Sequence, residues 1–65
     1  MKRYKATRDC IFAFGEYFKA YVTIKKGQIW EYNGENDTMI SICRNNTAIY
    51  IEHRYFENAF QEVKE

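Results

Sequence analysis

The sequence contains no proline, a single histidine and only three glycines among its 65 residues. Its two cysteines, Cys10 and Cys43, stand far apart and form no CxxC pair, which excludes a disulfide framework and a zinc site. The glycines are isolated, so there is no glycine-rich phosphate loop. We therefore expect no metal, no cofactor, and two free thiols in a reducing, cytoplasmic setting.

Long apolar segments are missing as well. No run approaches the roughly 20 residues that cross a bilayer. The charged start, MKRYKATRDC, lacks the apolar stretch of a signal peptide. The sequence therefore predicts a protein without a membrane segment.

Aromatic side chains are abundant instead, with six Tyr, five Phe and one Trp. A large ring can bury on the order of 150–250 Å², so a few rings can form the core of a small chain. The length is near the lower limit for independent folding. We expect a single domain over residues 1–65.

Apolar residues alternate with polar ones through most of the chain, as is typical of strands with one buried face. The predicted inward-facing residues are Tyr4, Val22, Ile24, Trp30, Ile40, Ile42, Ile49, Ile51, Phe56 and Phe60. Turn residues interrupt the alternation at 25–28, 33–37 and 44–47, where Gly27 and two asparagines tolerate a positive φ.

The last part of the chain has a different period. In HRYFENAFQEV, helical spacing relates Phe56, Ala59, Phe60 and Val63. This pattern predicts one or two helical turns followed by a short final strand.

The order of these segments resembles the SH3-like barrel across essentially the whole chain. CIFAFGEYFKAY, residues 10–21, matches the long first loop of that fold, VTIKKGQIWEY its diverging turn, and RYFENAF its last helical turn. The resemblance implies an all-β fold, a small SH3-like barrel of about five antiparallel strands with a short helical turn before the last strand. Residues 10–21 are expected to form a long folded-over loop or an irregular hairpin.

The chain departs from the peptide-binding SH3 domains. It has no ALYDY-like stretch, no Trp pair in TMISIC and no proline in the last turn, where only Tyr55 matches. Recognition of proline-rich peptides is therefore not implied. The sequence is more similar to small SH3-like proteins of phages and mobile elements of Gram-positive bacteria, which often show a KKG turn and a YFENAF-EV-like ending.

No catalytic constellation is evident. His53 is the only histidine, and nothing in the spacing brings it to Cys10 or Cys43 as the base of a nucleophile. We expect that the protein is not an enzyme.

The surplus of rings predicts a protein-binding surface, since Tyr and Phe are enriched at interfaces. The expected function is that of a non-catalytic binding module, a small phage or mobile-element protein that docks on a host or viral protein. Homodimerisation is compatible with this surface, and the alternative is that the first loop covers its own rings. The predicted partner-binding residues are Tyr17, Phe18, Lys19, Tyr21 and Tyr50.

An auxiliary nucleic-acid-binding protein is the second hypothesis. Residues 1–26 carry a net charge of +5, whereas residues 27–65 carry −4. Basic residues interleaved with rings can bind a backbone and stack on bases. The overall charge of +1 opposes this function. The residues that would carry it are Arg3, Lys5, Lys19, Lys25 and Lys26.

Overall fold

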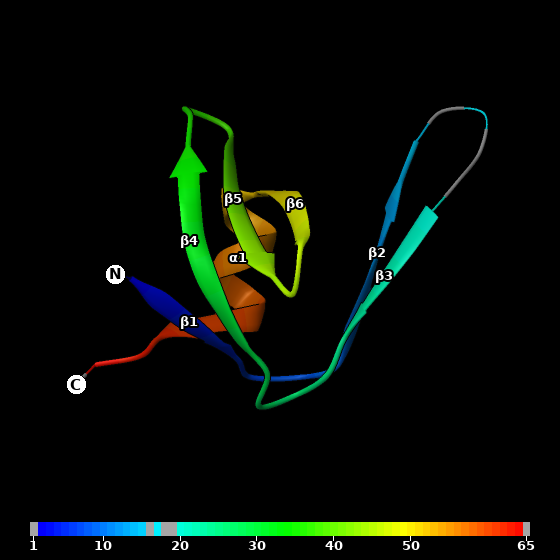
Figure 1. The fold of residues 1–65 in the computed structure, drawn as a ribbon. Coiled ribbons are helices and arrows are strands. Elements are labelled where there is room, and N and C mark those ends of the chain that lie inside the picture. Colours follow the sequence, from blue (N-terminus) through cyan, green and yellow to red (C-terminus); the bar gives the residue numbers. More distant parts are fainter. Residues whose placement is uncertain (1, 16, 18–19, 65) are drawn as a thin grey trace.

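The computed structural model describes residues 2–15, 17 and 20–64. These residues form seven strands and one helix (Figure 1). The elements are β1 (Arg3–Ala6), β2 (Cys10–Phe14), β3 (Ala20–Ile24), β4 (Ile29–Glu35), β5 (Met39–Arg44), β6 (Thr47–Glu52), α1 (His53–Ala59) and β7 (Phe60–Glu62). The predicted all-β class, with a short helix before the last strand, is confirmed at this level.

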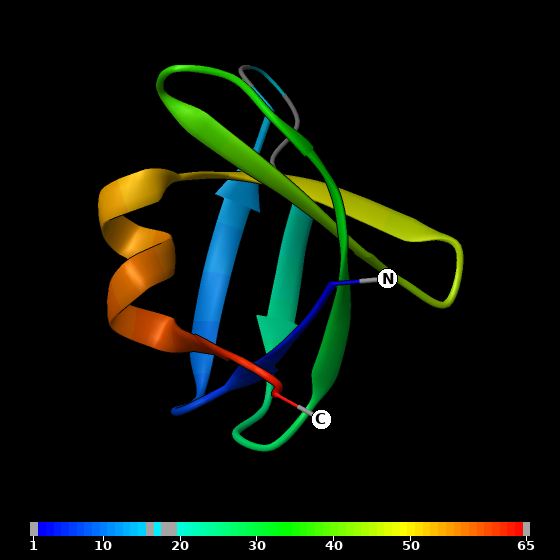
Figure 2. The same ribbon diagram turned by 90° about the vertical axis from the view of Figure 1, so that its left-hand side faces the viewer.

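The strands form two antiparallel sheets. The larger has the order β6-β5-β4-β1-β7, and the smaller is the β2-β3 hairpin. Among the described residues β6 and β7 do not pair with each other, so no closed barrel is found. Figure 2 shows the hairpin behind the larger sheet, with α1 beside it.

The core lies between the larger sheet, α1 and the base of the hairpin. Nine of the ten predicted inward residues are buried, together with Ala6 and Ala59. Val22 is the exception and is only half-buried. The hairpin diverges from the sheet beyond Ile24 (Figure 1), so a residue nearer its tip has less of the core to pack against.

Two of the three predicted turns have the expected residues with a positive φ angle. Gly27 has φ of 93°, and Asn45 and Asn46 have φ of 50° and 66°. The third differs, because β4 continues to Glu35 through a register shift with Gly34 at φ of 109°. A single glycine thus lets residues 33–35 remain in the strand as a bulge instead of forming a loop.

The turn between β4 and β5 is consequently short. The Asn36 Oδ1 accepts hydrogen bonds from the backbone N–H of Thr38 and of Met39, at 2.9 and 2.8 Å. Such a side-chain bond replaces a backbone turn bond.

The helix α1 is held by packing. It has seven residues and no side-chain N-cap bond, and it buries Phe56 and Ala59. The Phe56 ring meets Tyr4 edge-on at 4.8 Å and stacks on Phe60 at 5.0 Å. The predicted helical spacing reached Val63, but the helix ends at Ala59 because Phe60 is extended and pairs with Ala6 of β1. No helix among the described residues is long and apolar enough to cross a membrane.

Candidate protein-interaction surface

Residues 10–14 and 20–24 form a regular hairpin, whereas the sequence predicted a folded-over loop or an irregular hairpin. Five consecutive pairs join the strands, from Cys10 opposite Ile24 to Phe14 opposite Ala20. Both strands are rich in β-branched and aromatic residues, which favour the extended conformation. At the base, the Lys26 N–H donates to Asp9 Oδ1 at 2.7 Å, which joins the two ends of the segment.

The hairpin has two faces of different exposure. Because cross-strand partners point to the same side, the register assigns each pair to one face. The inner face contains Cys10, Phe12, Phe14 and Val22, which are partly buried against the core. The outer face contains Ile11, Ala13, Tyr21 and Thr23, and all four are exposed. We call these four residues the outer hairpin face.

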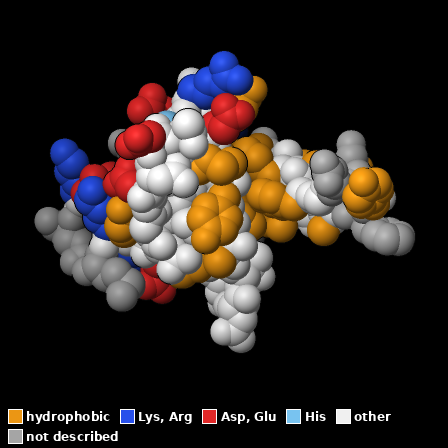
Figure 3. All heavy atoms as spheres, turned by 90° about the horizontal axis from the view of Figure 1, so that it is seen from above, with side chains coloured by type: hydrophobic (Ala, Val, Ile, Leu, Met, Phe, Trp, Pro, Cys, Tyr) orange, Lys and Arg blue, Asp and Glu red, His pale blue; other side chains and the backbone are white. Residues whose placement is uncertain are grey.

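A groove of about 250 Å³ lies beside β2. One wall is the hairpin and the other is formed by β5, β6 and α1. We call it the aromatic groove, and its lining residues are Phe12, Ala13, Phe14, Met39, Tyr50, Ile51, Glu52 and Tyr55. In Figure 3 the hydrophobic side chains extend from the body toward the hairpin, at the right, whereas charged side chains gather at the left and top. The aromatic groove therefore offers rings and a thioether for an apolar ligand group.

A second groove, of about 290 Å³, lies beside β3 and is more polar. The Trp30 indole N–H donates to Gln28 Oε1 at 3.4 Å, and Arg44 supplies the positive charge. The other lining residues are Tyr21, Val22, Thr23, Asn45 and Thr47. The hairpin is thus a ridge between an apolar and a polar groove.

The three predicted partner-binding residues that the structure describes, Tyr17, Tyr21 and Tyr50, do not line one groove. Tyr50 lines the aromatic groove, and Tyr21 lies on the outer hairpin face beside the polar groove. Tyr17 belongs to the chain segment that connects β2 to β3, and its side chain is 90% exposed. Phe18 and Lys19 lie outside the described residues. The prediction that Tyr50 points away from the core is confirmed by its exposure of 58%.

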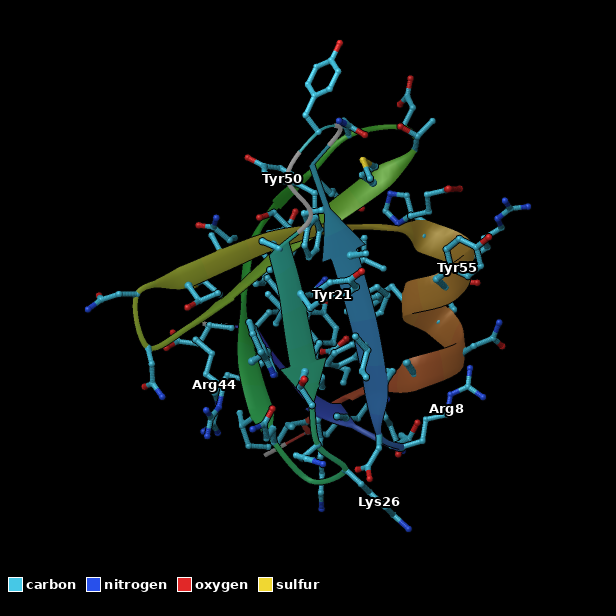
Figure 4. All side chains as sticks on the ribbon, turned by 90° about the vertical axis from the view of Figure 1, so that its right-hand side faces the viewer. Arg8, Tyr21, Lys26, Arg44, Tyr50 and Tyr55 are labelled. Carbon is cyan, nitrogen blue, oxygen red and sulfur yellow. The ribbon has the colours of Figure 1, made fainter. Side chains whose placement is uncertain are left out.

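Of the residues that line the aromatic groove, only Tyr50 was among the predicted partner-binding residues. Tyr55 was noted only as the residue that matches the last turn of the peptide-binding SH3 domains. Figure 4 shows Tyr50 and Tyr55 on the two elements that flank the hairpin. Phe12 belongs to the surplus of rings in residues 10–21, and no sequence signal marked Met39.

The predicted basic residues are only partly brought together. Lys5 and Lys26 line one hollow of about 500 Å³, with Gly27 and Gln61. Lys25 is exposed in the neighbouring turn, and Arg3 is half-buried in β1. The fifth residue, Lys19, is among those not described. Two lysines in one hollow could contact a phosphate group. The negatively charged Asp9 lies close by, since its Oδ1 accepts a hydrogen bond from the backbone N–H of Lys26.

The single histidine, His53, links the helix to a neighbouring turn. His53 Nε2 lies 2.8 Å from the carbonyl oxygen of Asn36 and 3.7 Å from Glu35 Oε2. A carbonyl oxygen only accepts, so Nε2 carries a proton and ties α1 to the β4-β5 turn. Among the described residues no three His, Cys, Asp or Glu side chains form a metal-binding group.

Both cysteines are free. Partial burial raises the pKa of the Cys10 thiol, while the nearby Arg8 opposes this shift. A thiol with a raised pKa is largely protonated at neutral pH and is a poor nucleophile.

The Tyr32 hydroxyl gives a pH-dependent prediction. It donates to Glu35 Oε1 at 3.0 Å, and this bond raises the pKa of Tyr32. The bond contributes to stability below the ordinary pKa of about 10, and this contribution is lost as the pH rises through the raised value. We expect Glu35→Ala to lower the pKa of Tyr32 in an NMR titration of its ring. Glu31→Ala should leave that pKa unchanged, and a raised pKa that survives Glu35→Ala would contradict the assignment.

Comparisons of the chain with protein-family models, with curated proteins and with solved structures gave no match. The functional conclusion therefore rests on the surface chemistry of the chain itself.

Proposed function

We propose that this protein is a non-catalytic binding module that docks on another protein through the aromatic groove. The main support is that Tyr50, Tyr55 and Met39 line one open groove together with residues of the hairpin. Tyr50 and Tyr55 remain 58% and 50% exposed there. Rings placed in a groove of this kind accept an apolar anchor residue, the usual centre of a protein interface.

The origin and the finer fold class belong to the same proposal. An SH3-like fold is supported by the strand order β6-β5-β4-β1-β7, by the hairpin inserted between β1 and β4, and by the helix before β7. The KKG turn and the YFENAF segment support a phage or mobile-element protein that acts on a host or viral protein in the cytoplasm.

Nucleic-acid binding is the second candidate, and the hollow that contains Lys5 and Lys26 favours it. The hollow lies beside the KKG turn, where Lys25 adds a third cation. Binding of this kind loses affinity steeply as salt increases, because phosphate contacts release counterions.

The test is affinity capture from a Gram-positive bacterial lysate with the native chain and with Tyr50→Ala/Tyr55→Ala. We expect the native chain to retain a discrete protein after nuclease treatment and the double variant to lose it at least tenfold. This factor corresponds to about 1.4 kcal/mol, a modest loss for two interface rings.

Tyr21→Ala is the matched control, because it removes an exposed ring outside the aromatic groove. It should retain the protein. Equal capture by the double variant would reject the aromatic groove as the docking site. Loss of all captured material on nuclease treatment would favour the lysine hollow instead.

A further inference from the structure

Arg44 occupies an inward-facing position at the end of β5. One residue separates Ile40 from Ile42 and Ile42 from Arg44, so all three side chains belong to the same face of the strand. The two isoleucines are buried in the core, and Arg44 is half-buried. Its cross-strand partner, Thr47, shares a face with the buried Ile49 in the same way. A guanidinium therefore stands where the period of β5 would place a further apolar side chain.

This guanidinium has no counter-charge. Among the described residues, the Arg44 side chain makes no hydrogen bond and no ion pair, whereas Arg54 of α1 lies 3.4 Å from Glu52 Oε2. Within the described lining of the polar groove there is also no Asp or Glu. A charge that is partly removed from water is unfavourable until a partner satisfies it. An anion in the polar groove would supply that partner.

Gln28 provides a second donor in the same groove. Its Oε1 accepts the backbone N–H of Lys25 at 3.2 Å and the indole N–H of Trp30 at 3.4 Å. Both of these groups only donate, so the two bonds identify the oxygen of the amide and place its NH₂ group at the other end. In the described part of the chain no acceptor bonds to this NH₂ group. Gln28 is half-buried, so its free donor also favours an acceptor from a ligand.

The two donors belong to different walls of the polar groove. Arg44 stands at the turn between β5 and β6, and Gln28 at the turn between β3 and β4. Figure 4 shows Arg44 on the β3 side of the hairpin. The planar guanidinium presents parallel N–H groups that match the two oxygens of a carboxylate. A carboxylate held by Arg44 would thus lie in a groove that offers a further N–H donor.

Charge and size narrow the ligand. Arg44 is the one cation among the described lining residues, and a carboxylate balances it. A phosphate group, with a charge of about −1.5 to −2, would leave negative charge in excess. The groove of about 290 Å³ is near the lower limit for small-molecule sites, so it suits one small acid or one side chain. Tyr21 and Val22 line it as well and offer apolar surface to the stem of such an acid.

We infer that the polar groove binds a carboxylate carried on a short apolar stem. The Arg44 guanidinium holds the two oxygens, the Gln28 amide donates a further hydrogen bond, and the stem lies against Tyr21 and Val22. Two sources supply this chemistry, a free small carboxylic acid and an acidic side chain of a polypeptide. The site is separate from the aromatic groove and goes beyond the proposed function.

The first measurement is an NMR titration of the isotope-labelled full chain with sodium benzoate. We expect saturable shifts of the Arg44 Nε–H and the Gln28 side-chain NH₂, with a dissociation constant in the millimolar range. Benzamide has the same ring and no charge, and it should bind at least tenfold more weakly. Inorganic phosphate should also bind more weakly than benzoate. The absence of saturable shifts, equal binding of benzamide or tighter binding of phosphate would overturn the inference.

The second measurement repeats the benzoate titration with variants. Arg44→Met removes the charge and keeps an unbranched side chain. Gln28→Glu keeps an oxygen for the two bonds that Gln28 accepts and replaces the NH₂ donor by a second carboxylate oxygen. Each should lower benzoate affinity at least tenfold, while the amide spectrum away from the groove shows that the variant is folded. Native affinity in Arg44→Met would overturn the inference.

Arg54→Met is the matched control, because it removes an arginine of α1 that already has a carboxylate partner. It should leave benzoate affinity unchanged. An equal loss in Arg54→Met would mean that benzoate responds only to the overall charge of the chain, and would overturn the site.

A third probe distinguishes the two sources. The α-amide of N-acetylglutamic acid carries its carboxylate as a polypeptide side chain does. Binding as tight as that of benzoate would assign the site to an acidic side chain of a partner, and binding of benzoate alone would assign it to a free acid. Tyr50→Ala/Tyr55→Ala should abolish partner capture and leave benzoate binding unchanged. Loss of benzoate binding in this folded double variant would place the acid outside the polar groove.

Discussion

Replacing Ile42 by alanine is expected to remove a large part of the free energy of unfolding. Ile42 has no exposed surface, and it pairs with Tyr32 of β4 and Ile49 of β6 at the centre of the sheet. Truncation at such a position costs about 2–5 kcal/mol. At 0.05–0.15 kcal/mol per residue, a chain of this length has a total stability of roughly 3–10 kcal/mol. Urea unfolding followed by circular dichroism measures the loss.

The matched control is Ile11→Ala, the same substitution on the outer hairpin face, where the side chain is 65% exposed. Its expected cost is about 0.5 kcal/mol or less, because most of this side chain is already in contact with water. Equal destabilisation by the two substitutions would mean that the core does not lie between the sheet and α1.

Phe56→Ala is expected to be nearly as disruptive, through the helix. Removal of a buried phenylalanine ring costs about 3–5 kcal/mol. The contacts of Phe56 with Tyr4 and Phe60 hold a seven-residue helix that lacks a capping side chain. Helices this short are not stable on their own. We expect α1 amides to lose protection from hydrogen exchange and the urea midpoint to fall.

Tyr55→Ala provides the comparison within the same helix. Tyr55 is 50% exposed, and its hydroxyl accepts a bond from Arg54 at 3.3 Å. This substitution should change the urea midpoint little and leave α1 protected. If Tyr55→Ala deprotects α1 as strongly as Phe56→Ala, packing of Phe56 is not what holds the helix.

The alternating period of the sequence was sufficient to predict which residues of the larger sheet's strands face the core. Ile40 and Ile42, like Ile49 and Ile51, are separated by one residue, so their common face was evident before the partner strands were known. Trp30 could be placed in the core by the same parity, and it is 3% exposed. These predictions succeeded because one face of each strand is apolar and the other is not.

The strand β2 lacks this contrast. CIFAF is apolar at every position, so its two faces cannot be distinguished by period. The exposed Ile11 and the partly buried Phe12 differ only in the structure, where the pairing with β3 and the position of the sheet decide which side faces inward.

The aromatic groove was harder still to predict, because it lies between elements that do not pair. Phe12 and Tyr55 are far apart in the sequence and line the groove from opposite walls. Their approach depends on the angle at which the hairpin leaves the sheet, which no local pattern encodes. The sequence could therefore predict a surplus of rings but not their division between the groove and the outer hairpin face.

The attachment of the hairpin has an evolutionary consequence. The bond from Lys26 to Asp9 closes its base, Ile24 anchors it in the core, and its two strands pair only with each other among the described strands. Changes in its length or composition beyond that base leave every backbone ladder of the larger sheet intact. The outward residues of the hairpin can therefore change without loss of any strand pairing in the larger sheet, whereas Phe12, Phe14 and Val22 stay tied to the core by packing.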